Sequence, residues 1–261
     1  MNTINAFTNK SLQAIGTLLL AMVLFAATAS HADEAGTLLV VGNSLGKHGP
    51  APSIGWNANN GMAASAPEYD YAHLLLKKLN LATGKEHRLF ITRVVDESNI
   101  GSLPAELPKQ ADVVVLQIGD NYKQKLDRAE AMRRYRALVT GLKRAYPSAA
   151  IVCVSPWKCA GGDFMQEAAQ TEHVPFANIK PLGGKPGMDG IGYSSWAVNW
   201  HPGDRGMEAI ADTIWEKLSP QIVKSRATAT LTGIVPEVQE VSLLPGEEFL
   251  LTKEMPMIQL C

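Results

Sequence analysis

The stretch Thr37-Leu-Leu-Val-Val-Gly-Asn-Ser-Leu45 is the part of the sequence that decides the fold. Its first five residues are nearly all apolar and stop at Gly42, which is typical of a strand buried on both faces. A serine follows at once on a tight Gly-Asn-Ser turn. A hydroxyl at such a turn is exposed, and helix N-terminal amides stabilise negative charge nearby. The stretch therefore predicts a buried parallel strand whose end carries a candidate nucleophile, Ser44.

Strand-like and helix-like segments alternate through the rest of the chain. Apolar, β-branched runs predict strands at 37–41, 88–95, 111–118, 150–154 and 174–179, and amphipathic segments predict helices at 70–81, 127–144, 164–172 and 204–218. This alternation predicts a three-layer α/β/α, flavodoxin-like fold around a mostly parallel sheet of about five strands. Ligands of such sheets bind beyond the carboxyl ends of the strands. We therefore expect functional residues just after Val41, Ile118 and Val154.

The two ends of the chain differ from this middle part. Lys10 precedes a long apolar run, and Ser30-His31-Ala32 has the small residues of a cleavage site. This layout predicts a signal peptide over 1–32 and a periplasmic or secreted product, and the rival is a retained membrane anchor. We expect the main domain at 33–225 and a small C-terminal β appendage at 226–261, where Thr, Val, Glu and Pro dominate.

Composition excludes several classes of protein. The 261 residues are 46% hydrophobic and 19% charged, an ordinary globular balance that excludes disorder for the bulk of the chain. The formal net charge is −1, so no basic field exists to hold nucleic acid. No spacing of His, Asp, Glu or Cys predicts a metal site, and no phosphate-binding glycine motif is present. We expect no cofactor.

The three cysteines are too few for a disulfide scaffold. In an oxidising compartment, however, Cys153 and Cys159 are close enough in sequence to form a local disulfide. The alternative is two separate thiols, with Cys153 buried in a strand. Cys261 is the last residue, and we expect it to be free or intermolecular.

Four short blocks carry the candidate chemistry. They are Gly42-Asn-Ser-Leu45, Asn60-Gly61, Gly119-Asp-Asn121 and His201-Pro-Gly-Asp204. In this order and spacing the blocks resemble those of the SGNH/GDSL hydrolase family, over about residues 37–218. The resemblance implies that Ser44 is the nucleophile and His201 the general base. It also implies an oxyanion hole built from the amides of Ser44 and Gly61 and the side chain of Asn121.

The sequence departs from the family pattern at two positions. Asn43 stands where the family usually has the aspartate of Gly-Asp-Ser, and Val198 stands where it usually has the acid that orients the histidine. Three substitutes for that acid remain open: a backbone carbonyl near Val198, Asp189 and Asp204. We favour the carbonyl, because Asp204 is well placed to cap the last helix.

The long segments 46–67 and 181–202 are expected to line the site. His48, Trp56 and Trp200 are candidate substrate contacts, since aromatic faces stack on sugars, although loop packing and solvation explain these side chains equally well. The resemblance implies a serine esterase acting on O-acyl or O-acetyl esters of a small molecule, lipid or acylated glycan. The leader adds export, and export together with the loop tryptophans is the only ground for a carbohydrate substrate. The alternatives are a polysaccharide O-acyltransferase and a non-catalytic binding module. Nothing beyond residue 32 predicts a stable membrane span.

Overall fold

A computed structural model describes residues 35–94, 97–98, 100–101, 103–104, 106–123, 126–159 and 162–233, with side chains up to residue 224. Five strands form one sheet in the order β2-β1-β3-β4-β5, and every neighbouring pair is parallel. The strands are β1 Gly36–Gly42, β2 His87–Arg93, β3 Val113–Gln117, β4 Ala150–Val154 and β5 Phe176–Ala177. This is the flavodoxin-like order, with its switch point between β1 and β3, so the predicted fold class is confirmed.

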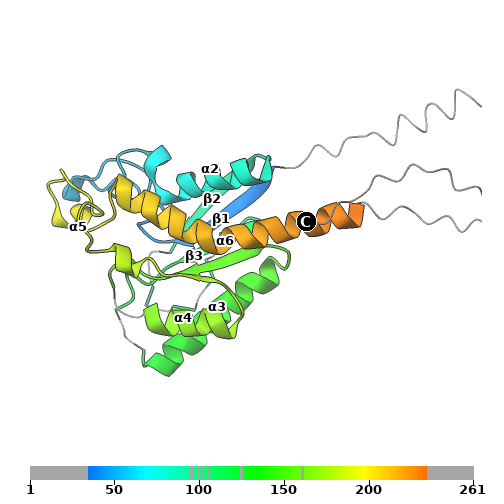
Figure 1. The fold of residues 1–261 in the computed structure, drawn as a ribbon. Coiled ribbons are helices and arrows are strands. Elements are labelled where there is room, and N and C mark those ends of the chain that lie inside the picture. Colours follow the sequence, from blue (N-terminus) through cyan, green and yellow to red (C-terminus); the bar gives the residue numbers. More distant parts are fainter. Residues whose placement is uncertain are drawn as a thin grey trace, which may run out of the picture. The chain divides into compact units, whose positions relative to one another are not determined.

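Two pairs of helices cover the two faces of the sheet (Figure 1). Helices α2 (Tyr71–Thr83) and α6 (Asp204–Gly233) pack on one face, and α3 (Arg128–Ala145) and α4 (Gly162–Thr171) pack on the other. The central strands have no polar face. In β1, Leu38 and Val40 face the first pair of helices, whereas Leu39 and Val41 face the second. This explains why the strand is apolar at each position from Leu38 to Val41.

Helix starts follow the capping residues in the sequence. The Asp70 carboxylate accepts a hydrogen bond from the His73 amide at the start of α2, and Asp127 accepts one from the Glu130 amide at the start of α3. Each bond satisfies an amide that has no partner within its helix. Short helices lie in the loops: the 3₁₀ turns η1 Pro52–Ile54, η2 Pro67–Tyr69 and η3 Lys180–Leu182, and α5 Trp196–Asn199.

The C-terminal part differs from the prediction. The last helix was expected to end at residue 218 and a β appendage to begin at 226, but α6 continues to Gly233. Pro220 lies inside it, and Leu218 and Ile222 on either side are buried in the core, so packing outweighs the cost of the proline. The chain divides into two compact units, up to Ile222 and from Val223 onwards. Residues 234–261, like the predicted signal peptide at 1–32, lie outside the described residues.

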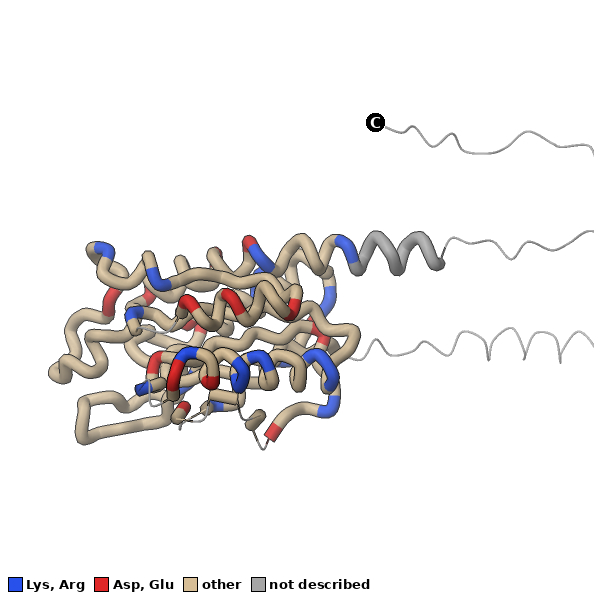
Figure 2. Tube along the Cα trace, turned by 90° about the horizontal axis from the view of Figure 1, so that it is seen from below, with Lys and Arg blue, Asp and Glu red and all other residues tan. Residues whose placement is uncertain are grey.

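Charged residues of both signs are distributed along the helices. Figure 2 shows Lys and Arg interspersed with Asp and Glu, as the formal net charge of −1 implies. Among the helices of the described part, none combines the length and the apolar character that crossing a membrane requires.

Candidate active site

The candidate nucleophile lies on the turn that follows β1. Asn43 begins this turn: its carbonyl oxygen accepts hydrogen bonds from the amides of Gly46 and Lys47, both at 3.1 Å, and its side-chain oxygen accepts one from the Leu45 amide at 3.0 Å. The turn presents Ser44 at the carboxyl end of the sheet, where its residue is 8% exposed. The turn thus fixes the serine while leaving it accessible.

His201 holds the Ser44 hydroxyl. The Ser44 Oγ lies 2.8 Å from His201 Nε2, and the opposite ring nitrogen, Nδ1, lies 2.7 Å from the Ala197 carbonyl oxygen. A carbonyl oxygen can only accept, so Nδ1 carries the proton and Nε2 of the neutral ring is left as an acceptor. The ring is therefore in the tautomer that takes a proton from the serine.

The end of α5 explains why a carbonyl is free to hold the ring. The His201 amide donates to the Val198 carbonyl at 3.0 Å, in an i→i−3 bond that tightens the last turn. The Ala197 carbonyl, which a continuing helix would pair with that amide, is left for the imidazole. The loop is clamped from the other side, because the Gly190 amide donates to the His201 carbonyl at 2.7 Å. Backbone geometry therefore orients the histidine.

The electrostatics of the site keep this histidine neutral. Burial is the main cause that lowers the pKa of His201 to about 4, and the charges of His48, Lys158 and Arg93 act in the same direction. The Ala197 carbonyl raises the pKa but does not offset burial. An imidazole must be unprotonated to act as a general base. His201 is unprotonated above about pH 4 before any substrate binds.

Of the three substitutes for the triad acid, the structure brings only the carbonyl to His201. Asp189 forms an ion pair with Lys158, with 2.6 Å between Oδ2 and Nζ. Asp204 accepts hydrogen bonds from the amide and hydroxyl of Ser65, at 2.7 and 2.6 Å, so its carboxylate ties α6 to the loop before α2. Val198 itself is fully buried, in an apolar cluster with Trp56, Met62 and Ala63. The structure thus pairs Ser44 with His201, hereafter the dyad, and orients the imidazole through a backbone carbonyl.

The expected oxyanion donors behave differently from one another. The Asn121 side chain is exposed and makes no hydrogen bond within the described part, while its backbone amide donates to Glu97 Oε2 at 2.8 Å. The Ser44 amide likewise has no partner among the described residues. Both donors are therefore without a partner among the described residues.

Gly61 does not fit the expected role in this geometry. Its amide donates to Asp70 Oδ2 at 3.2 Å, so it is not a free donor. A glycine is required there for packing, because a Cβ would meet the Leu45 carbonyl oxygen at 2.5 Å and the Asp70 Cβ at 2.9 Å. The sequence marks the glycine but not the acceptor of its amide, because Asp70 lies nine positions further along the chain.

The predicted substrate contacts divide into one packing residue and two neighbours of the dyad. Trp56 is 2% exposed, and its indole N–H donates to the His48 carbonyl at 3.1 Å. As a substrate contact, Trp56 was therefore predicted wrongly, because it packs the loop. Trp200 is half-buried, with its ring centroid 5.4 Å from that of His201. His48 is half-buried, and burial lowers its pKa.

The predicted disulfide is absent. Cys153 and Cys159 are both free thiols. Cys153 lies on the face of β4 that packs against α3, where burial raises the pKa of its thiol to about 12. The Cys159 thiol instead donates to the Asp120 carbonyl at 3.1 Å, at the end of the sheet. The strand directs the first thiol into the core and away from the loop that carries the second.

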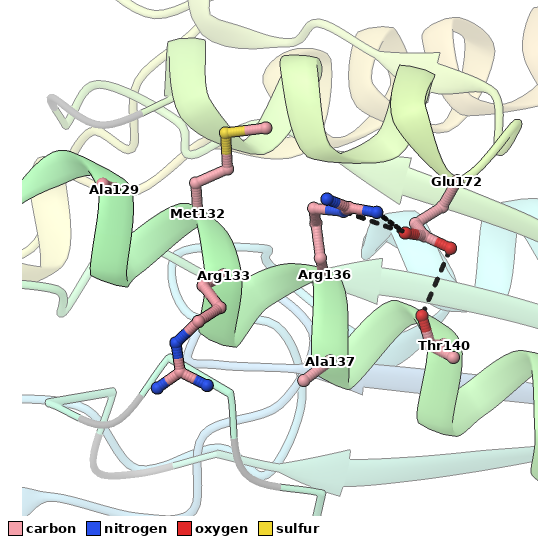
Figure 3. Close-up of a pocket in the computed structure, with 7 residues that line it drawn as sticks. All are labelled: Ala129, Met132, Arg133, Arg136, Ala137, Thr140 and Glu172. Carbon is pink, nitrogen blue, oxygen red and sulfur yellow. Dashed lines mark hydrogen bonds and ion pairs between the residues drawn. The ribbon is translucent and has the colours of Figure 1, made fainter.

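A separate surface hollow of about 370 Å³ lies between α3 and α4 (Figure 3). Its charged groups all have partners: Arg136 forms an ion pair with Glu172 at 2.8 Å, Thr140 donates to the same carboxylate at 3.2 Å, and Arg133 is paired with Glu130 outside the hollow. None of the predicted site residues lines it. Across the described residues, no group of three or more His, Cys, Asp and Glu side chains is arranged to hold a metal ion.

Comparison with known proteins gives likenesses of structure only. No protein-family model and no curated protein matches the chain. The chain is similar to a family 2 carbohydrate esterase with a carbohydrate-binding domain from Corynascus thermopiles (Myceliophthora fergusii), at 12% identity over 72% of this chain and 67% of that chain, with a TM-score of 0.45. It is also similar to a family 2 carbohydrate esterase from Clostridium thermocellum in complex with cellohexaose, at 17% identity over 74% and 65% of the two chains, with a TM-score of 0.46.

A third similar structure is a phospholipase A1 from Streptomyces albidoflavus, at 13% identity over 70% of this chain and 99% of that chain, with a TM-score of 0.45. The chain spans only 67% and 65% of the lengths of the two carbohydrate esterases. Likenesses this distant carry no conclusion about activity. The functional conclusion depends on the geometry around Ser44 and His201.

Proposed function

We propose that the protein is a serine esterase that hydrolyses O-acyl esters through an acyl-serine intermediate. The observation that carries this proposal is the 2.8 Å contact between Ser44 Oγ and His201 Nε2, with Nδ1 fixed on the Ala197 carbonyl. A serine hydroxyl becomes a useful nucleophile only when a neighbouring base takes its proton. The dyad supplies that base in its neutral form and in the correct tautomer.

The proposed reaction has two halves. Ser44 Oγ attacks the ester carbonyl carbon while its proton passes to His201 Nε2. The oxyanion that forms is bound by the Ser44 amide and the Asn121 side chain. The intermediate collapses, the alcohol leaves with the proton from His201, and the acyl group stays on Ser44. Water then attacks the acyl-serine with His201 again as the base, which releases the acid.

The test is hydrolysis of an aryl-ester series of increasing acyl length, with a serine-directed phosphonate located by mass spectrometry. We expect labelling at Ser44 and loss of turnover in Ser44→Ala, with the fold intact. Asn121→Ala should lower kcat by about 10²–10³ with little change in KM. Labelling of another serine, or full activity in Ser44→Ala, would contradict the proposal. Partition of product between water and a sugar acceptor distinguishes a hydrolase from an acyltransferase.

We further propose a carbohydrate as the alcohol part of the substrate. The support is Trp196, which lies in α5 five residues before His201 and is 76% exposed. A large apolar ring left in water beside a candidate site suits stacking on a sugar face. Trp196→Ala should lower kcat/KM for an acetylated oligosaccharide while leaving an aryl acetate unaffected. Leu81→Ala, which removes an equally exposed apolar side chain at the end of α2, is the matched control.

Export through the leader at 1–32 is part of the same proposal. Its test is N-terminal sequencing of the protein recovered outside the cytoplasm, which should begin at Asp33. A product that keeps Met1 and the apolar run would indicate a retained anchor instead.

A further inference from the structure

Every polar atom of the Asn43 side chain, in the residue before Ser44, takes part in a hydrogen bond. The residue is fully buried. The Asn43 Nδ2 group donates to Glu97 Oε1 at 3.1 Å and to Asp120 Oδ2 at 2.9 Å, while Oδ1 accepts from the Leu45 amide at 3.0 Å. The amide therefore uses both of its hydrogens on two different carboxylates. Neither Glu97 nor Asp120 has a part in the dyad.

The same two carboxylates also accept hydrogen bonds from the loops that follow β3 and β4. Glu97 is 1% exposed, and its Oε2 accepts from the amides of Gly119 and Asn121, both at 2.8 Å. Asp120 accepts from the Trp157 amide at 2.7 Å and from Gln117 Nε2 at 2.8 Å. The carboxyl ends of β1, β3 and β4 are thus joined through one asparagine and two acids.

The chemistry of this cluster demands a donor at position 43. Burial raises the pKa of both Glu97 and Asp120, and the hydrogen bonds from Asn43 oppose that rise. An ionised aspartate at position 43 would turn acceptors toward acceptors and place a third negative charge in a buried space. The neutral amide is therefore matched to its surroundings. This gives a physical reason for Gly-Asn-Ser where Gly-Asp-Ser is usual in the family that the blocks resemble.

We infer that Glu97 and Asp120 are positioning residues, which act through Asn43 to fix the turn that carries Ser44 against the loop that carries Asn121. The inference rests on the proposed function, since it assigns the two acids to the alignment of nucleophile and oxyanion donor. A displacement of about 1 Å between such groups costs on the order of 10² in rate. The acids are thus expected to act on kcat without touching substrate.

The test reverses the direction of one hydrogen bond. Asn43→Asp leaves acceptors facing each other, and Glu97→Gln leaves donors facing each other, so each should lower kcat by about 10² with KM little changed. In the double variant, the glutamine amide donates to the new carboxylate, and its oxygen can still accept from Gly119 and Asn121, whereas the hydrogen bond to Asp120 stays broken, so recovery is partial. We expect the double variant to be about tenfold more active than either single variant, because residues in contact are not additive. Glu208→Gln, an exposed acid on α6, is the control for loss of one charge.

Three measurements decide the outcome: kcat on an aryl ester, the rate of phosphonate labelling at Ser44, and the midpoint of thermal unfolding. Recovery of kcat and labelling in the double variant supports the inference. Additive losses overturn it, as does a fall in the unfolding midpoint with kcat unchanged, which is the signature of a merely structural role. If the wild-type protein is labelled at Ser44 but hydrolyses no ester, the proposed function fails, and the labelling rates alone decide the inference.

Discussion

Two histidines in this protein each place Nδ1 on an oxygen atom, yet their pKa values are shifted in opposite directions. His201 Nδ1 lies 2.7 Å from a carbonyl oxygen, and the pKa of the ring is lowered to about 4. His73 Nδ1 lies 2.8 Å from the Asp70 carboxylate, and that hydrogen bond raises its pKa. The partner's charge and the depth of burial make the difference. The His73–Asp70 pair taken alone resembles the histidine and acid of a catalytic triad, but it lies at the start of α2, where Asp70 caps the helix.

The largest expected effect separates the two histidines by function. His201→Ala should lower kcat on an aryl ester by about 10⁴–10⁶, because the serine loses its base. His73→Ala should change kcat less than about threefold, since the Asp70 carboxylate still accepts from the Gly61 and His73 amides. Steady-state kinetics on both variants checks this, and a collapse of activity in His73→Ala would reverse the comparison.

The pH profile sharpens the same contrast. His201 must be neutral to act as a base, and the neutral form prevails above its pKa of about 4. The kcat/KM value should therefore stay level as pH falls from 8 to 5 and decline only near pH 4. An ordinary histidine would already have lost about 30-fold at pH 5. An acid limb near pH 6.5 in wild type would show that burial does not lower the pKa as described.

The carboxylate that distinguishes His73 can be neutralised. Asp70→Asn keeps a cap for α2 but turns an amide N–H toward the Gly61 amide or the His73 ring, so donors face each other. We expect a loss of about 1–3 kcal/mol in the free energy of unfolding, measured with denaturant. The raised pKa of His73 contributes stability at low pH that is lost as pH rises through that pKa, so the loss should be larger at pH 6 than at pH 9.

Asp212→Asn is the control for Asp70→Asn, because it breaks only the exposed ion pair with Lys78 and should cost less than about 0.5 kcal/mol. An equal loss at pH 6 and pH 9 in Asp70→Asn would contradict the role of His73 described above.

The smallest effects are expected at the two acids that flank His201 in the sequence, the last one before it and the first one after it. Asp189→Asn and Asp204→Asn should each change kcat less than about threefold, because neither carboxylate reaches the imidazole. Kinetics at a single neutral pH is sufficient. A fall of about 10⁴ in Asp189→Asn, with an unchanged unfolding midpoint, would mean that an acid orients His201 after all.

Local patterns predicted the sheet because its central strands contain runs of consecutive apolar residues, and they predicted Ser44 and His201 because each belongs to a compact block. They failed where the decisive contact joins distant segments. Glu97 lies in a stretch without periodicity, 54 residues from Asn43, and nothing local marks it as a partner. In the sequence Asp70 stands only as the first residue of a predicted helix, and nothing local indicates that one of its oxygens holds the Gly61 amide. The run of α6 beyond residue 218 was missed because Pro220 reads as a helix end.

The carbonyl of Ala197 has a consequence for how such a site changes over generations. A carboxylate that orients a histidine is lost by one codon change, whereas every residue carries a carbonyl. What must be kept is the tight turn at the end of α5, and many different side chains are compatible with its backbone. Position 198 then needs no acidic side chain and is constrained only by its apolar packing. A search that requires an acidic residue near the histidine would therefore miss relatives that use a carbonyl. A change that moves the turn, such as Asn199→Pro, which removes the hydrogen bond from the Asn199 amide to the Ser195 carbonyl, would inactivate a chain whose dyad is otherwise intact.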